Sequence, residues 1–158
     1  MIASTSTNYT GRKKDISVFH SPVATQKGPQ NITVAFGKNG QFCAGLQKII
    51  QRYAIVLLTN IGSQFSYPTF GTNLLFALQA GFSPIDKLRA SQIFNLASYD
   101  AVNLLKTYQT TRDDIPQDER IVSATLRDIS LNNGSASFDV AVATEAGSSM
   151  TFLIPLPR

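Results

Sequence analysis

The sequence is poor in the residues that hold metals and form disulfides. It contains one cysteine, Cys43, and one histidine, His20. A single cysteine cannot form a disulfide within the chain, and with one histidine it cannot supply a typical zinc site. Neither a P-loop nor a glycine-rich dinucleotide fingerprint is present. These absences argue against metal, redox and nucleotide chemistry, so we expect no cofactor, a buried Cys43 and a loop position for His20.

Long hydrophobic runs are also missing. The longest, Tyr53 to Leu58, has six residues, whereas a membrane-spanning helix needs roughly 20. The first residues lack the apolar stretch of a secretory signal. We therefore expect a protein that does not span a membrane and carries no secretory signal.

Charge is scarce and unevenly placed. Charged residues make up 15% of the chain, against about 25% in ordinary soluble domains, while a hydrophobic content of 43% is enough for a core. The whole net charge of +4 lies within residues 1–38, where five basic residues face only Asp15. The cluster Arg12-Lys13-Lys14 is short and has few aromatic neighbours, so it favours an arm that orders on a protein neighbour over nucleic-acid binding. The low surface charge elsewhere also suggests covering partners.

The hydrophobic pattern divides the chain into an arm, a helical part and a β part. Residues 1–30 show no period and predict an extended basic arm. Apolar residues at three- and four-residue spacings predict three helices, with Gln47, Lys48, Gln51 and Arg52 on the wet face of the first. Their expected ranges are about 43–59, 72–79 with Thr72 as N-cap, and 83–108 with Ser83 as N-cap before Pro84.

After a polar connector, the period changes to two. Alternation predicts a short strand at 32–36 and three long strands near 120–131, 135–144 and 148–156, the last ending or lying at an edge because of Pro155 and Pro157. The fold class is therefore α+β: an extended N-terminal arm, three helices, then a C-terminal antiparallel β meander. We expect one domain over 31–158, helical at about 41–110 and β at about 119–156.

The order of these elements and one loop carry a resemblance. A helix ending in Tyr53-Ala-Ile-Val-Leu-Leu-Thr59 is followed by an Ile61-Gly62-Ser63 turn and by Pro68-Thr69-Phe70-Gly71-Thr72-Asn73-Leu74-Leu75-Phe76. From about Asn31 to Pro155 this arrangement resembles the gene-25-like wedge family of contractile phage-tail baseplates, which is related to the type VI secretion baseplate. The family's Glu-Pro-Arg is replaced by Tyr67-Pro68-Thr69, so both charges of that loop are missing.

The resemblance implies a structural role in the virion, at the tail baseplate, after assembly in the host cytoplasm. The helical part would pack into a wedge bundle, and the β part would offer strands as a template on which the sheath starts. Partners would be other wedge proteins, sheath subunits and central hub or tube proteins. The partner-binding residues expected from this reasoning are Tyr67, Pro68, Thr69, Phe70, Gly71, Val122, Leu126, Val140, Phe152 and Ile154.

Three alternatives stay open. The strands could simply close the core of one domain. The chain could be a lysozyme-like glycoside hydrolase, for which the acidic cluster Asp113, Asp114, Asp118 and Glu119 would have to supply two carboxylates. We interpret that cluster instead as a solvated connector balanced by Arg112 and Arg120, and expect no enzyme. The third alternative is a generic protein-interaction adaptor.

Overall fold

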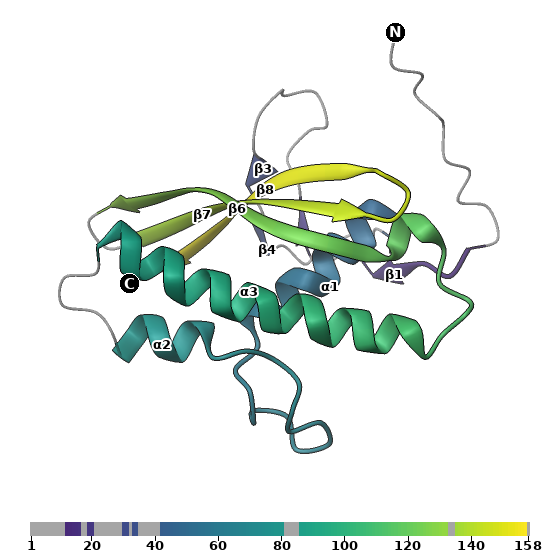
Figure 1. Ribbon diagram of the computed structural model, residues 1–158, viewed down its shortest axis with the longest axis horizontal. Coiled ribbons are helices and arrows are strands. Elements are labelled where there is room, and N and C mark those ends of the chain that lie inside the picture. The colour runs from purple at the N-terminus through teal and green to yellow at the C-terminus, as the bar shows by residue number, and fades with distance from the viewer. Residues whose placement is uncertain are drawn as a thin grey trace, which may run out of the picture.

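The computed structural model describes residues 12–16, 19–20, 30–31, 33–34, 42–80, 86–132 and 135–157. Helices precede a C-terminal antiparallel sheet (Figure 1), so the predicted α+β class is confirmed. The helices are α1 (Leu46–Leu58), α2 (Leu74–Ala80) and α3 (Lys87–Thr110), followed by the 3-10 turn η1 (Gln117–Glu119). The long strands are β6 (Ile121–Asn132), β7 (Ser135–Thr144) and β8 (Ser149–Pro157).

Among the residues that the structure describes, five two-residue strands precede the helices. They are β1 (Asp15–Ile16), β2 (Phe19–His20), β3 (Gln30–Asn31), β4 (Thr33–Val34) and β5 (Phe42–Cys43). The pairs β1–β5 and β2–β4 are antiparallel. His20 thus lies in a strand and not in the predicted loop, because its backbone pairs with Thr33. Cys43 is buried, as expected. Of the predicted strand at 32–36, the described residues keep Thr33 and Val34.

The main sheet has the order β3-β8-β7-β6. β7 pairs antiparallel with both long neighbours, from Ser135↔Asn132 in β6 and from Ser135↔Pro157 in β8. β3 lies parallel to β8, opposite Phe152 and Leu153 only. Beyond these positions no described strand covers the outer side of β8, and Pro155, which lacks an N–H, lies in that part as an edge position allows.

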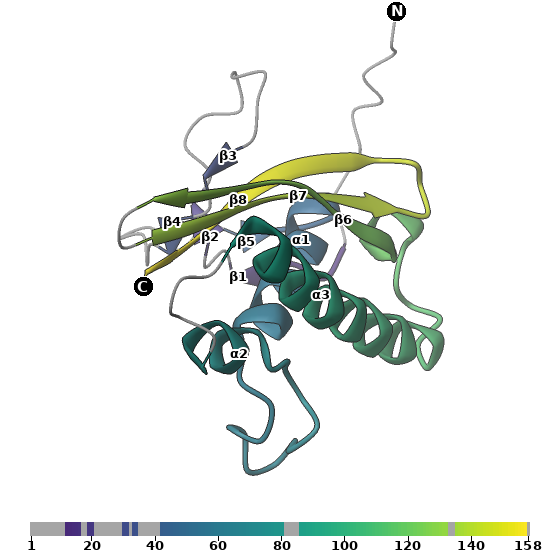
Figure 2. The ribbon, with the colours of Figure 1, turned by 60° about the vertical axis from the view of Figure 1, so that its left-hand side comes forward.

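The helices cover one face of this sheet. α3 runs under β6 and β7, with α1 beside it and α2 farther from the strands (Figures 1 and 2). The rings of Phe94 and Phe138 stack at a centroid distance of 4.8 Å and join α3 to β7. Between α1 and α3, the buried hydroxyl of Tyr53 lies 2.8 Å from the Ser98 hydroxyl, and burial raises the pKa of Tyr53. Helices and sheet therefore share one core.

Two predictions about the helices are wrong in detail. α3 begins at Lys87, because the Asp86 carboxylate accepts a hydrogen bond from the Arg89 N–H at 2.7 Å and caps the helix; the predicted cap Ser83 lies outside the described residues. Lys48 and Gln51, expected on the wet face of α1, are buried. The reason is that the arm lies across them.

Candidate partner-binding site

The segment between α1 and α2 is a loop that is closed at its base. The Thr72 N–H donates to the Thr59 carbonyl at 2.8 Å, and the Ile61 N–H donates to the Thr72 carbonyl at 3.0 Å. Farther out, the Gly62 N–H donates to the Pro68 carbonyl at 2.9 Å. Such cross-bonds hold a compact surface loop in one conformation. We call residues 60–72 the aromatic loop.

Gly71 makes the closure possible. Its φ is +110°, and a Cβ there would lie 2.3 Å from the Thr59 carbonyl oxygen. Next to it, the buried Thr72 hydroxyl donates to the Leu57 carbonyl at 2.7 Å and accepts from the Leu74 N–H. A side chain at Gly71 would push the two ends of the loop apart. α2 begins at Leu74, so Thr72 lies one residue before the cap position at which it was predicted, although its hydroxyl still takes up the amide of the first helical residue.

The aromatic loop presents apolar side chains to solvent. Phe65 is fully exposed, Tyr67 is 69% exposed and Ile61 is 46% exposed. Beside Tyr67 lies a groove of about 610 Å³, which we call the α1–α3 groove. Its walls come from α1, from the loop and from the C-terminal half of α3; they are formed by Arg52, Ile55, Val56, Tyr67, Thr69, Phe70, Leu104, Leu105, Thr107, Tyr108 and Thr111.

Three of the predicted loop residues therefore meet at one surface. Tyr67, Thr69 and Phe70 line the groove, while Pro68 is exposed at the loop surface. Gly71 is buried and acts on the loop through its backbone. The sequence did not indicate that Tyr108 and Leu104 would form the opposite wall, because helical periodicity does not say which neighbours a half-buried residue faces.

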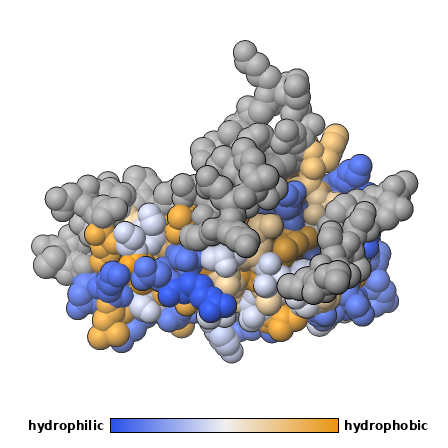
Figure 3. All heavy atoms as spheres, turned by 90° about the horizontal axis from the view of Figure 1, so that it is seen from above, coloured by the Kyte–Doolittle hydropathy of each residue, from blue (hydrophilic) through white to orange (hydrophobic). Residues whose placement is uncertain are grey.

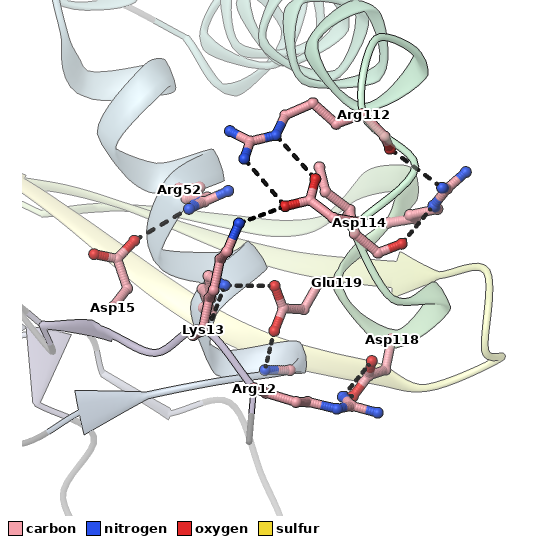
Figure 4. A network of polar contacts seen from close by, with 12 residues as sticks. Arg12, Lys13, Asp15, Arg52, Arg112, Asp114, Asp118 and Glu119 are labelled. Carbon is pink, nitrogen blue, oxygen red and sulfur yellow. Dashed lines mark hydrogen bonds and ion pairs between the residues drawn. The ribbon is translucent and has the colours of Figure 1, made fainter. Parts of the chain in front are cut away.

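At the other end of α1, the arm is tied to the molecule by polar contacts (Figure 4). Lys48 donates to the Lys13 carbonyl at 2.7 Å, and Gln51 donates to the Ile16 carbonyl at 2.8 Å. Arg12 forms an ion pair with Asp118 at 2.7 Å. We call this region, residues 12–16 with 48–52 and 112–119, the arm junction.

Glu119 is the centre of the arm junction. Its side chain is 5% exposed; one oxygen accepts from Lys48 Nζ at 2.6 Å and the other from the Gly45 N–H at 3.2 Å. Gly45 is the N-cap of α1 and has no side chain that could cap the helix. The Glu119 carboxylate, from a distant part of the chain, lies at this partially positive helix end instead. The predicted solvated connector is therefore wrong for Glu119, because pairing with Lys48 allows its burial.

The rest of the connector is also held in place. Gln109 donates to the Glu119 carbonyl at 2.9 Å and accepts from the Ile121 N–H at 3.0 Å, which fixes α3 to the start of β6. Asp114 accepts from Nε and Nη2 of Arg112, both at 3.1 Å, and from Lys13 at 2.7 Å. These hydrogen bonds, that of Arg112 first, hold the pKa of Asp114 well below its usual value.

These contacts bear on the hydrolase alternative. A glycosidase acid needs a carboxyl group that faces a substrate cleft, with a second carboxylate across it. Both Glu119 oxygens are engaged in structural contacts, and Glu145 lies exposed in the turn before β8, 3.9 Å from Arg120. Across the described ranges, no three His, Cys, Asp or Glu side chains gather as a metal site would require. Asp114, Asp118 and Glu119 of the acidic cluster form the contacts of the arm junction.

The predicted residues of the sheet divide into two groups. Val122 is 44% exposed at a bulge of β6, and Leu126 is half-buried against the core. Val140 and Ile154, both predicted to bind a partner, are wholly buried on the helix-covered face, so their side chains are not offered to one. They close the domain's own core, as the alternative reading held. The side chain of Phe152 lies outside the description; its backbone pairs with Val140 and Gln30.

The face of the sheet away from the helices has a different character. Seen from above, the described surface is a mosaic of hydrophilic and hydrophobic residues (Figure 3). Asp139 lies opposite Asp128 across β7 and β6, and its Oδ1 is buried without a hydrogen-bond partner. Burial, followed by the charge of Asp128, raises the pKa of Asp139.

β6 forms the outer edge of the sheet among the described strands. Its register shifts at two places, between Ile121 and Ser123 and between Leu126 and Asp128. Bulges of this kind twist an edge strand and interrupt its free hydrogen-bonding groups. Four residues, 123–126, separate the two irregular positions. In the part of the chain that is described, no helix has the length and hydrophobicity to cross a lipid bilayer.

Comparison with known proteins adds little. No protein-family profile matches the sequence, and no curated protein matches it. Among solved structures, the chain is similar to a protein of Geobacter sulfurreducens provisionally described as a tail lysozyme. The two are 12% identical, the match covers 70% of this chain and 88% of that one, and the TM-score is 0.41. Neither the activity nor the partners of that protein are transferred to this chain at this level of similarity.

Proposed function

We propose that this chain is a structural subunit of a contractile phage-tail baseplate. Its helical half packs against other wedge proteins, and its sheet offers an edge on which the first sheath subunits add strands. The proposal is supported by the resemblance of residues 53–76 to the gene-25-like wedge family and by the order of helices before meander. The proposed role is structural and includes no catalytic activity.

The observation that carries the proposal is the aromatic loop. Apolar side chains fully in water, such as Phe65, gain free energy when a partner covers them, at about 25 cal/mol per Å². Because the hydrogen bonds of Thr72 and Gly62 already fix the loop, little conformational entropy is lost on docking. A rigid loop with exposed aromatic residues next to an apolar groove is well suited to anchor a neighbouring subunit.

The proposed role of the sheet rests on its edge. β6 has no strand on its outer side among the described residues, and an open edge can pair with a strand of another chain. The two bulges restrict regular pairing to short stretches. The predicted residues Val122 and Leu126 belong to this edge strand, whereas Val140 supports it from the core.

The test is the presence of the chain in assembled tails. Contractile tails purified from the source should contain it by mass spectrometry, and a density map should place it at the end of the tail where the sheath begins. In a strain with Val122→Lys, which places a charge on the edge, sheath assembly should fall, while Asn103→Lys, at an exposed position of α3 outside the groove, should leave it unchanged. Absence of the chain from purified tails would overturn the proposal, as would cleavage of peptidoglycan by the purified protein.

A further inference from the structure

Two hollows of the surface share a wall. The α1–α3 groove adjoins a second cavity of about 620 Å³, and both are lined by Arg52 and Tyr108. The second cavity, which we call the arm cavity, also includes residues 12–15 of the arm together with Lys48, Arg112, Asp114, Ile115, Pro116 and Glu119. A bound segment could therefore extend from one hollow into the other.

The shared wall is cationic and aromatic. The guanidinium carbon of Arg52 lies 5.9 Å from the centre of the Tyr108 ring, and that of Arg112 lies 5.5 Å from it. Arg52 is only weakly engaged otherwise, since its contact with Asp15 is 3.4 Å long and both side chains are partly exposed. A guanidinium has five N–H donors, so Arg52 can bind a further acceptor without leaving the ring.

The arm cavity carries an excess of positive charge. Six of its lining side chains are basic and three are acidic. Arg12 is paired with Asp118, which lies outside the lining, and Arg52 is paired with Asp15. Lys13, Lys48 and Arg112 share Asp114 and Glu119. Lys14 is exposed and forms no ion pair or hydrogen bond with any residue that the structure describes. The free charge thus lies in the cavity, next to the apolar groove.

We propose that the groove and the arm cavity together bind one amphipathic helix of a partner protein, with aliphatic side chains in the groove and carboxylates at one end in the cavity. This names the chemistry of the helical partner in the proposed function and rests on it. Two adjacent helices with Ile55, Leu104 and Tyr108 between them form a groove into which a third helix can pack. The charge of the cavity then selects the acidic end of that helix.

A protein helix fits this surface better than a nucleic acid. Nucleic acids follow extended basic tracks, because each phosphate carries a charge. Here the cationic residues are confined to one end, and the cavity already holds Asp15, Asp114 and Glu119, which would repel a chain of phosphates. One or two carboxylates match the excess charge, and the apolar half of the surface has no role in phosphate binding.

The test uses a synthetic 18-residue helical peptide with leucines at i, i+3, i+4 and i+7 spacing and two glutamates at one end. Its affinity for the full chain is measured by fluorescence anisotropy. Tyr67→Ser should weaken binding at least about tenfold, as for a buried aromatic anchor. Lys14→Glu should weaken it roughly two- to fivefold, and replacing the two glutamates of the peptide by glutamine should have a similar effect.

Matched variants control for general changes of the surface. Tyr99→Ser removes a tyrosine that is 66% exposed on α3 outside both hollows, and Lys106→Glu reverses an exposed α3 lysine outside them. Both should bind the peptide as the unmodified chain does. Circular dichroism of each variant establishes that it is folded.

Three results would overturn the inference. They are equal affinity of the Tyr67→Ser and Tyr99→Ser variants, no dependence on the glutamates, and displacement of the peptide by a single-stranded oligonucleotide whose own binding requires Lys14. Peptide binding does not depend on tails. If the chain is found in tails but does not bind the peptide, the proposed binding site is wrong and the baseplate role is not affected. If the chain binds the peptide but is absent from tails, the baseplate role is wrong and the binding site is not affected.

Discussion

The arm junction and the aromatic loop lie at opposite ends of α1, and they differ in which side chains they bury. At the junction, Lys48 and Glu119 are charged and nevertheless buried. In the loop, Phe65 and Tyr67 are apolar and nevertheless exposed. Each region departs from the usual distribution of residues between core and surface. The junction satisfies its charges within the chain, whereas the loop leaves its apolar surface for another molecule.

The difference shows how to distinguish structural residues from binding residues in this molecule. A buried charge with a hydrogen-bonded partner in a distant segment of the same chain indicates a structural role, because the two segments must meet for the charge to be satisfied. Exposed aromatic residues on a loop that is fixed by hydrogen bonds indicate a surface for binding a partner. Replacing a charged side chain of the junction should therefore affect folding stability, whereas replacing an exposed side chain of the loop should affect assembly. The two glycines of the loop are a separate case, because substitutions there change its backbone conformation.

The largest effect on stability is expected from Lys48→Met. The variant leaves the buried Glu119 carboxylate without its counter-ion, which should lower the free energy of unfolding by about 3–5 kcal/mol. Urea denaturation followed by circular dichroism measures the change. Lys87→Met, at an exposed pair with a distance of 3.5 Å, is the control and should change stability by less than about 1 kcal/mol. Equal effects of the two variants would mean that the junction has no special role.

Gly71→Ala should have the next largest effect. The new Cβ meets the Thr59 carbonyl, and the positive φ disfavours any side chain, so a loss of about 2–3 kcal/mol is expected. Gly62→Ala has a similar φ of +80° but open space around it, and should lose about 1–2 kcal/mol. If thermal and urea unfolding rank the two variants the other way, the closed base does not hold the loop.

Asp139→Asn extends the comparison to a charge that is partly buried without a partner. Because the pKa of Asp139 is raised in the folded protein, its charged form lowers stability above that pKa, and the loss is relieved as the pH falls through it. The variant should therefore be more stable at pH 7 by up to about 1 kcal/mol. The gain should shrink toward pH 3. Asp100→Asn, at an exposed position of α3, is the control and its effect on stability should not depend on pH in this way.

The smallest effect on stability is expected in the aromatic loop. Replacing both Phe65 and Tyr67 by serine removes side chains that are exposed, so the free energy of unfolding should stay within about 0.5 kcal/mol of its original value. Self-association at high concentration, measured by light scattering, should fall because apolar surface is removed. A clear loss of stability in this variant would show that the loop packs on its own domain and is not left for a partner.

Much of the fold could be predicted because its signals are local. The spacing of Ile49, Tyr53 and Val56 has the helical period, and the alternation of Phe138, Val140 and Val142 has the period of a strand. Helix starts are harder, since Ser83-Pro84 and Asp86 are both acceptable caps within one turn. The tertiary structure selected Asp86, and the sequence alone holds no signal that separates them.

The candidate site was predicted only in part. The loop residues Tyr67 and Phe70 stand out by composition and by resemblance, but the arm junction does not. Lys48 meets a carbonyl 35 residues away and a carboxylate 71 residues away. No period links residues at such separations, so a lysine on a helix is assigned to solvent.

The contact between Arg12 and Asp118 also has a consequence for how the protein is made. Its two residues are 106 positions apart. During translation at about 5 to 20 residues per second, the arm emerges roughly 5 to 20 seconds before its counterpart exists. The helices can form meanwhile from nearer neighbours. The nascent arm can therefore meet Lys48 and Gln51 of α1 first, 35 residues away, and only its contact through Arg12 has to wait for the connector.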